Sequence, residues 1–234
     1  MTTLSLPSSI VPAEVTWHLE PNTGVFVSPL TRTTQTIELP GARWVCEMRL
    51  PTMTATNWRQ YTAWLAKMRG QAGRVYITPP HYRGSSATSW SVDSSAISCD
   101  STMTTCDSTT ETCDQSEESA FGSPVVDGAS QTGSTLRTRG WVNDVTVLQA
   151  GDYISYDTTR GRTLHMVVED AVSNGVGDCD LTIEPPIRTS PADAAAINYT
   201  TPSCIMTLSD AMSGAPTIGL RLRAAIQMSL VEVF

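Results

Sequence analysis

Residues 151–188 read GDYISYDTTRGRTLHMVVEDAVSNGVGDCDLTIEPPIR, and this stretch decides the fold of the C-terminal half. Residues 147–156 and 163–168 are rich in β-branched and aromatic side chains, and residues 157–162 between them carry turn chemistry around Gly161. Two such runs joined by a short polar segment are typical of paired β-strands. The sequence therefore predicts a β-hairpin at the centre of this half.

A third strand is predicted after the polar turn at residues 173–178. Leu181 and Ile183 point to one side of it and the polar residues that alternate with them to the other, because side chains alternate along a strand. Pro185 and Pro186 are expected to end the strand, since proline has no N–H to donate to a ladder. Short strands in this order predict a small β-barrel, and no catalytic motif lies on it.

The N-terminal region is predicted to contain strands at residues 32–37, 44–50 and 74–78, with a turn of sequence LPGA at residues 39–42. In the second strand apolar and charged side chains alternate, which predicts one face on a core and the other in water. The residues of the apolar face are Trp44, Cys46, Met48 and Leu50.

An amphipathic helix is predicted at residues 55–69. Thr54 can cap its N-terminus, because a hydroxyl accepts an unpaired backbone N–H there, and Gly70 follows as a left-handed stop. An apolar stripe repeats at spacings of three and four residues, and we expect it to face the core. The stripe consists of Trp58, Tyr61, Leu65 and Met68, broadened by Trp64.

The end of the chain, residues 219–234, again alternates between apolar and polar side chains. A long terminal strand needs a sheet, and the N-terminal strands are its simplest partners. The sequence therefore predicts a discontinuous β-rich domain at residues 1–90 and 206–234. A small β-barrel-like domain at residues 121–205 is inserted into it, after a low-complexity stretch at residues 91–120.

Composition argues against two classes of protein. The formal net charge is −8, and Lys67 is the single lysine among 15 lysine and arginine residues. A surface that follows nucleic-acid phosphates needs clustered positive charge, so nucleic acid is a poor candidate partner. Residues 1–15 lack the features of a signal peptide, and no window reaches the roughly 18 apolar residues of a membrane span. We expect synthesis in a cytosol and no membrane span.

Residues 99–119 form three tandem heptads, CDSTMTT, CDSTTET and CDQSEES. Zinc and iron–sulfur sites usually bring two cysteines within about two to four residues of each other, and a spacing of seven does not. The thiols that could still form a metal or disulfide cluster are Cys99, Cys106 and Cys113, with Cys179, Cys204 or an aspartate as the fourth ligand. We assign no metal and no cofactor.

Two other interpretations of the repeat stay open. Disulfides are disfavoured in a reducing cytosol but could form after release. We favour a solvated repeat, because its apolar content is too low to offset the entropy of ordering. Such a segment would project from the fold or pack only against copies of itself in an oligomer.

The sequence offers no catalytic cluster. His18, His81 and His165 are far apart and have no neighbours at ligand spacing, and no GxSxG, HExxH, Walker or GxGxxG motif occurs. Asp93, Asp100, Asp107 and Asp114 lie in low-complexity sequence, where no scaffold holds two carboxylates at a working distance. We therefore predict that the chain is not an enzyme.

Several short motifs resemble the distal tail proteins of long-tailed bacteriophages. In the first half they are FVSPLT at residues 26–31, LPGARW at 39–44, LPTMT at 50–54 and GRVY at 73–76. In the second half they are VDG at residues 126–128, GDY at 151–153, LH at 164–165 and IEPPIR at 183–188. The resemblance covers most of the chain except the cysteine repeat.

This resemblance implies a β-sandwich belt-type domain with one helix, plus a second β module that is sometimes galectin-like or of barrel type. It also implies a structural virion protein, assembled in the host cytoplasm, that forms a ring at the tail tip. The ring would have six copies and would join the tail tube protein to the tip or baseplate hub protein. Its function would lie in its interfaces, which edge strands can supply.

Two alternative functions are kept. The first is a carbohydrate-binding or host-attachment module, in which exposed Trp90, Trp141, Tyr153 or Tyr156 stack on sugar faces. The second is a metal-binding component of the tail tip that uses the cysteines.

Overall fold

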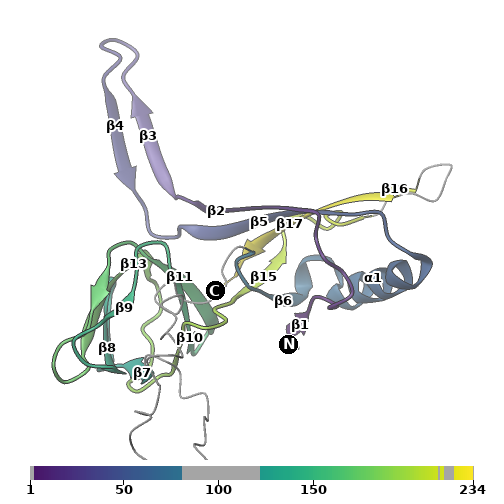
Figure 1. Cartoon of the computed structure of the whole chain (residues 1–234). Helices are drawn as coiled ribbons and strands as arrows, with labels where there is room; N and C mark the ends of the chain where they lie inside the picture. The colour runs from purple at the N-terminus through teal and green to yellow at the C-terminus, as the bar shows by residue number, and fades with distance from the viewer. Residues whose placement is uncertain (1–2, 81–121, 216, 219–223, 234) are drawn as a thin grey trace, which may run out of the picture.

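The computed structural model describes the chain except for residues 1–2, 81–121, 216, 219–223 and 234. In the described residues the fold is mainly β, as the sequence predicts, with one α-helix and several sheets. Figure 1 shows a broad sheet with the helix beneath it, a compact barrel at one end of that sheet, and a long hairpin rising from the same end.

The broad sheet has seven strands from both ends of the chain. Their order is β1-β6-β15-β17-β5-β2, and β16 pairs with β17. All neighbours are antiparallel except β1 and β6. The strands are β1 (Thr3–Ser5), β2 (Glu14–Glu20), β5 (Arg43–Leu50), β6 (Arg74–Ile77), β15 (Cys204–Leu208), β16 (Thr217–Ile218) and β17 (Ala224–Glu232).

β17 lies in the middle of this sheet. It pairs with β5 on one side and β15 on the other, which confirms the predicted pairing of the C-terminal strand with N-terminal strands. The apolar face predicted for β5 is buried, while Glu47 and Arg49 are exposed on the other face. This alternation fixes the register, because a slip of one residue would turn every buried side chain of the strand into water.

The helix α1 (Ala55–Met68) covers one face of the sheet (Figure 1). Thr54 caps it as predicted, since its hydroxyl accepts the N–H of Asn57. The buried stripe differs slightly from the prediction: Trp64 is buried with Tyr61 and Met68, whereas Trp58 is only half-buried. The helix ends at Met68. Gly70 takes the predicted left-handed conformation with a φ of +63°, and Arg69 before it is left-handed as well, with a φ of +50°; Gly70 begins a short 3-10 turn η1 (Gly70–Ala72).

The barrel is a six-stranded sheet that is nearly closed on itself. Its order is β14-β10-β11-β13-β8-β7, and a single bridge between Val125 and Ala196 joins the two edges. The strands are β7 (Gly122–Val126), β8 (Gly133–Trp141), β10 (Tyr153–Thr158), β11 (Gly161–Val167), β13 (Cys179–Ile187) and β14 (Ile197–Asn198). A small pair, β9 (Thr146–Leu148) and β12 (Ala171–Val172), covers one side.

The hairpin predicted around Gly161 is present as β10 and β11, but its first strand is shorter than predicted. Residues 147–156 do not form one strand, because the chain turns between β9 and β10. Gly151 has a φ of +99°, which glycine adopts readily, and Asp152 accepts the N–H of Gln149 at 2.9 Å. The turn thus separates a short covering strand from a barrel strand.

The prediction that Pro185 and Pro186 end their strand is wrong. β13 runs through both prolines to Ile187, with Leu181 and Ile183 buried as predicted. The pairing of β13 with β8 shifts register between Thr182 and Ile187. The prolines lie in that irregular region, where the ladder requires no N–H from them.

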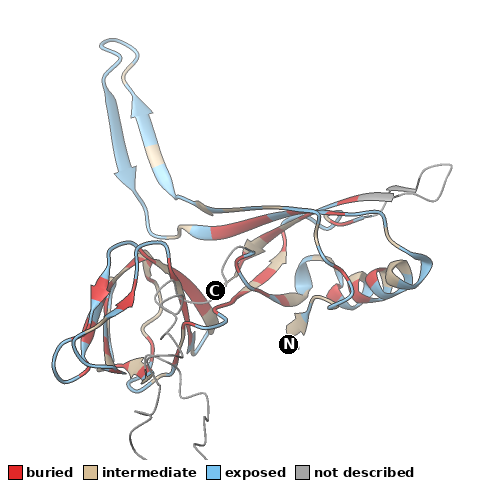
Figure 2. Ribbon diagram, viewed as in Figure 1, coloured by how far each residue is buried: buried red, intermediate tan, exposed pale blue. Residues whose placement is uncertain are grey.

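Two buried cores meet at one end of the broad sheet. One lies between the sheet and α1, and the other lies inside the barrel. Leu164 of β11 belongs to the first core, and Tyr153 and Met166 pack against it. The barrel therefore packs against the same face of the sheet that α1 covers, as the buried segments in Figure 2 show.

Candidate assembly surface

A long two-stranded hairpin projects from the broad sheet. Its strands, β3 (Thr23–Val27) and β4 (Thr34–Glu38), pair with each other along their whole lengths and with no other described strand. The backbone also orders the loop: Ser28 donates to the carbonyl of Thr33, and Arg32 donates to that of Ser28, both at 2.9 Å. We call residues 23–38 the arm, and Figure 1 shows it standing away from both cores.

The arm continues the pair β2–β5 but changes direction at a bend. Two residues, 21–22, separate β2 from β3, whereas four residues, 39–42, separate β4 from β5. Unequal numbers of residues on paired strands bend the ladder, as in a β-bulge. Asn22 holds this bend, since its carbonyl accepts the N–H of Leu39 at 2.8 Å and its side chain donates to the carbonyl of Pro40 at 3.0 Å.

Both faces of the arm expose apolar side chains. Because side chains alternate along paired strands, Phe26 and Ile37 lie on one face, and Val25 and Val27 lie on the other. These four are 52% to 62% exposed, and Leu30 at the tip is 94% exposed. Figure 2 shows almost the whole arm as exposed. An arm with apolar groups on both faces is better suited to insertion between two surfaces than to lying on one surface.

Little within the described chain stabilises the arm. None of its side chains belongs to either buried core, and a lone two-stranded hairpin is at best marginally stable in water. Burial of a Val, Ile or Phe side chain contributes about 1.5–3 kcal/mol. A partner surface is therefore the largest source of stabilisation open to the arm.

The arm also continues an open sheet edge. β2 pairs with β5 on one side and with no described strand on the other. Unpaired N–H and C=O groups along such an edge can template another strand. Glu14, His18 and Glu20 are exposed along β2 and limit indiscriminate pairing there, whereas β3 reads TGVFV and carries no charge. The uncharged edge of β3 is the part best suited to a new strand.

The opposite face of the sheet, away from α1 and the barrel, is polar. Glu14, Glu47, Arg49 and Gln227 help to line a shallow hollow of about 360 Å³. Arg49 and Glu14 form an exposed ion pair at 3.9 Å, a kind of contact that contributes at most about 1 kcal/mol. This face offers polar contacts, and the apolar contact area lies on the arm.

A buried ion pair joins the barrel to the sheet. Arg188, just after β13, donates to Glu232 of β17 at 2.9 Å and to the carbonyl of Ala42 at 2.7 Å. Glu232 also accepts the backbone N–H of Trp44, whose indole donates to the carbonyl of Leu164 at 2.9 Å. Arg188 and Glu232 are 11% and 1% exposed, so water hardly screens their attraction. These contacts fix how the barrel sits on the sheet.

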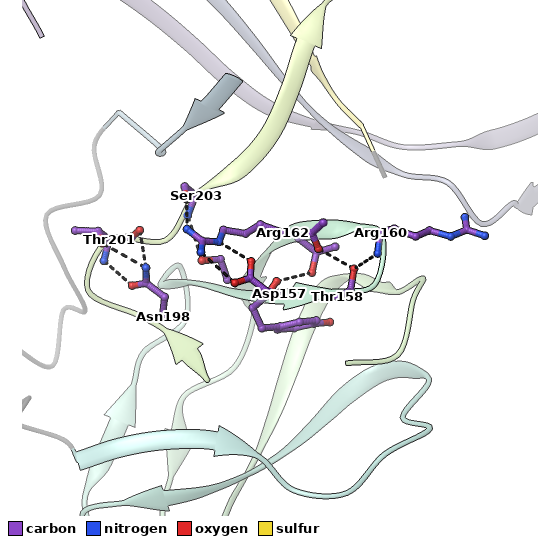
Figure 3. Close-up of polar contacts among 11 residues, drawn as sticks. Asp157, Thr158, Arg160, Arg162, Asn198, Thr201 and Ser203 are labelled. Carbon is purple, nitrogen blue, oxygen red and sulfur yellow. Dashed lines mark hydrogen bonds and ion pairs between the residues drawn. The ribbon is translucent and has the colours of Figure 1, made fainter. Parts of the chain in front are cut away.

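A second set of polar contacts holds the β10–β11 hairpin against the chain that returns to the sheet (Figure 3). Arg162 pairs with both carboxylate oxygens of Asp157, at 2.9 and 3.2 Å, and reaches the hydroxyl of Ser203 at 3.4 Å. Its guanidinium also lies over the ring of Tyr76, 5.3 Å from the centroid. Since Tyr76 belongs to β6 and Ser203 precedes β15, this cluster reinforces the same attachment.

The predicted thiol cluster cannot be located, because Cys99, Cys106 and Cys113 lie outside the described residues. Cys46, Cys179 and Cys204 are free and buried, and burial raises the pKa of Cys46 to about 12 and that of Cys179 to about 11. Within the described part of the chain no group of three or more His, Cys, Asp or Glu side chains could hold a metal ion.

The aromatic side chains proposed to stack on sugars are not exposed where the structure describes them. Trp141 and Tyr156 are 4% and 2% exposed, and Tyr153 is half-buried with its ring 5.5 Å from that of Trp44. Expecting an exposed stacking platform from these three residues is therefore wrong. Their side chains point into the barrel core or into the contact between the barrel and the broad sheet, which we call the junction. Trp90 lies outside the described residues.

His165 is a buried structural histidine, as predicted, although only one of its ring nitrogens has a protein partner among the described residues. Nδ1 lies 2.7 Å from the carbonyl oxygen of Pro185, and the ring stacks on Tyr156. Burial lowers the pKa of His165 to about 4, because the charged imidazolium loses its hydration. His18 is exposed on β2, and His81 is outside the described residues.

The buried His165 predicts a loss of stability in acid. In the unfolded chain a histidine has a pKa near 6.5, so between about pH 6.5 and 4 the unfolded state binds a proton that the folded state does not. The free energy of unfolding should therefore fall by about 3 kcal/mol through this window, since each pH unit is worth about 1.4 kcal/mol.

Urea denaturation at a series of pH values measures how much His165 contributes to the pH dependence of the free energy of unfolding. His165→Asn keeps a donor near Nδ1 and removes the titration, so its curve should be flatter than that of the wild type. Glu232 acts in the opposite sense, because burial raises its pKa, and comparing the two proteins cancels that contribution. Parallel curves for wild type and variant would contradict the prediction.

A scan against protein-family models finds no matching family, and no curated protein matches the chain. Membership of the distal tail protein family therefore stays a prediction. No helix within the described residues is long and apolar enough to span a membrane.

Sequence reasoning missed the arm as a surface. Phe26 and Val27 fall within the FVSPLT motif at residues 26–31, and nothing local in the sequence distinguishes an exposed apolar strand from a buried one. The junction was missed as well, because 44 residues separate Arg188 from Glu232.

Proposed function

We propose that this chain is a structural protein of a long-tailed phage, and that copies of it form a ring connecting the tail tube to the tail tip. The arm is the observation that carries the proposal. An apolar hairpin on one end of the sheet, inserted into a different surface of the next copy, makes a head-to-tail interface. Such an interface closes into a ring when a whole number of the rotations that relate neighbouring copies makes one full turn.

The shared core supports a structural role. A ring subunit has to keep its parts in fixed relative positions, and the barrel shares core residues and a buried ion pair with the sheet. Breaking a buried pair costs about 3–5 kcal/mol, which resists movement of the barrel. The barrel would then extend from the ring at a fixed angle, available to the tip or hub protein.

The placement of the motifs agrees with this proposal. FVSPLT, residues 26–31, forms the tip half of the arm, and LPGARW, residues 39–44, spans the bend and the start of β5. LPTMT, residues 50–54, leads into α1, and GRVY, residues 73–76, leads into β6. Two of the first-half motifs thus lie on the arm and its bend, and the other two lie at the start of α1 and of β6. The proposed number of six copies comes from the resemblance alone.

Light scattering of the purified full chain and electron microscopy of phage particles test the proposal. A ring of uniform mass, located between tube and tip, is the expected result. A protein that remains monomeric at all concentrations and is missing from particles would rule it out. A glycan array on the same sample tests sugar binding separately, and selective binding to one saccharide class would favour the host-attachment alternative.

A further inference from the structure

The polar turn at residues 173–178, between β12 and β13, contains an asparagine followed by a glycine. Asn174–Gly175 is the one such pair among the five asparagines of the sequence. Both residues are exposed. The pair matters chemically, because the backbone nitrogen that follows an asparagine can attack the amide carbon of its side chain. Glycine has no side chain, so this nitrogen can approach other groups closely.

The turn holds the side-chain amide of Asn174 in one orientation. Its Oδ1 accepts the N–H of Val176 at 3.0 Å and the N–H of Asp178 at 2.8 Å. Both partners are backbone donors, so the amide atom that faces them is the oxygen and not the NH2 group. The carbonyl of this amide is therefore polarised by two hydrogen bonds that the folded turn keeps in place.

The backbone nitrogen of Gly175 has no such partner. It donates its N–H to no group in the part of the chain that the structure describes, and the residue is exposed, so hydroxide from water can remove the proton. When this nitrogen attacks Cγ of Asn174, negative charge develops on Oδ1. Two N–H groups already directed at that oxygen lower the barrier, as the donors of an oxyanion hole do.

We propose that Asn174 deamidates spontaneously in the folded protein. The nitrogen of Gly175, having lost its proton to hydroxide, forms a bond to Cγ of Asn174 and closes a cyclic imide. The bond from Cγ to Nδ2 breaks, and Nδ2 leaves as ammonia after taking a proton from water, which regenerates hydroxide. Water then opens the imide at either of its carbonyl groups. One water is consumed, nothing is oxidised or reduced, and the product is aspartate or isoaspartate.

The two products change the turn differently. Aspartate keeps an oxygen that can accept the N–H groups of Val176 and Asp178. Isoaspartate carries the main chain through the side-chain carbon, and the backbone carbonyl of residue 174, which accepts the N–H of Gly177 at 3.0 Å, becomes a free carboxylate. Either product adds a negative charge beside Asp178 and Asp144, whose N–H bonds the same carbonyl at 3.3 Å. The modification therefore alters one turn of the barrel.

Incubation of the purified full chain at mildly alkaline pH, followed by peptide mapping with mass spectrometry, tests the proposal. Asn174 should become a mixture of aspartate and isoaspartate, at a rate in the folded protein at least equal to the rate in urea. Asn198 is the matched internal control. Its Oδ1 also accepts a backbone N–H, that of Thr201 at 2.9 Å, but the next residue is Tyr199, whose bulky side chain hinders the attack. Asn198 should remain an amide.

Gly175→Ala tests the nucleophile directly. The backbone of Gly175 is not left-handed, and a Cβ there would lie 3.6 Å from the carboxylate of Asp144, an ordinary contact, so the variant is expected to fold. The added methyl group hinders the approach of the nitrogen and should slow the conversion at least about tenfold, a rise of about 1.4 kcal/mol in the barrier.

Three results would each overturn the proposal. The first is a slower conversion of Asn174 in the folded protein than in urea, because the fold would then protect the amide; this comparison needs no variant. The second is an equal rate for wild type and Gly175→Ala. The third is aspartate without isoaspartate, which would mean that water attacks the amide directly and no cyclic imide forms.

Discussion

Replacing Phe26 and Ile37 together by serine is expected to convert the assembled protein into monomers. The two side chains share one face of the arm and are each 62% exposed in the single chain. Their burial at an interface contributes about 1.5–3 kcal/mol each, so losing both costs at least about 3 kcal/mol. That corresponds to a decrease of more than about 100-fold in the association constant, measurable by light scattering over a dilution series.

Two controls make this experiment specific. Val176→Ser removes an apolar side chain that is 75% exposed on the barrel and should leave the assembly intact. Val25→Ser with Val27→Ser probes the other face of the arm, and insertion between two surfaces predicts a comparable loss. All variants should unfold at the wild-type urea concentration as monomers, because exposed substitutions change stability by about 0.5 kcal/mol or less. An unchanged mass for the Phe26–Ile37 variant would refute the role of the arm.

The second large effect is expected at the junction, where Arg188→Leu should lower the free energy of unfolding by about 3–5 kcal/mol. The substitution leaves the carboxylate of Glu232 buried without its cationic partner, and it also removes the donor to the carbonyl of Ala42. Urea denaturation followed by tryptophan fluorescence measures the loss, because Trp44 packs at this junction.

The matched control for Arg188→Leu is Arg43→Leu, which breaks the pair with Glu20. That pair is as short, at 2.7 Å, but its side chains are 46% and 48% exposed, so the expected cost is below about 1 kcal/mol. Adding Glu232→Leu to Arg188→Leu should recover much of the loss, because two apolar groups replace the pair and no buried charge remains. Equal losses from the two single arginine variants would show that burial is not the source of the effect.

The sequence predicts those parts of the fold in which apolar and polar side chains repeat with a local period. The alternation in β5 and β17 and the stripe of α1 each repeat within a few residues. Each of these faces packs against the core where the structure describes it, although Trp58 and Leu65 of the helix stripe are only half-buried. The hairpin turn at Gly161 is local as well. Each of these elements is selected by side chains that neighbour one another in sequence.

The remaining features depend on residues that are distant in sequence. The barrel closes through a single bridge between Val125 and Ala196, and no local pattern marks either residue. Pro185 and Pro186 look like a strand end by themselves and are tolerated only because β8 is out of register beside them. The sequence of the arm looks like that of an ordinary apolar strand. Whether its apolar side chains are exposed depends on whether other parts of the chain cover them, and no local pattern shows that.

The unequal connections at the bend separate the direction of the arm from the stability of the molecule. Adding or removing a residue in 39–41, ahead of the carbonyl of Ala42 that Arg188 bonds, would change the angle between the hairpin and the sheet. Neither core extends into that segment. Chains of this design can therefore vary the angle at which they reach outward by changing loop length alone, while the folded body they reach from stays the same.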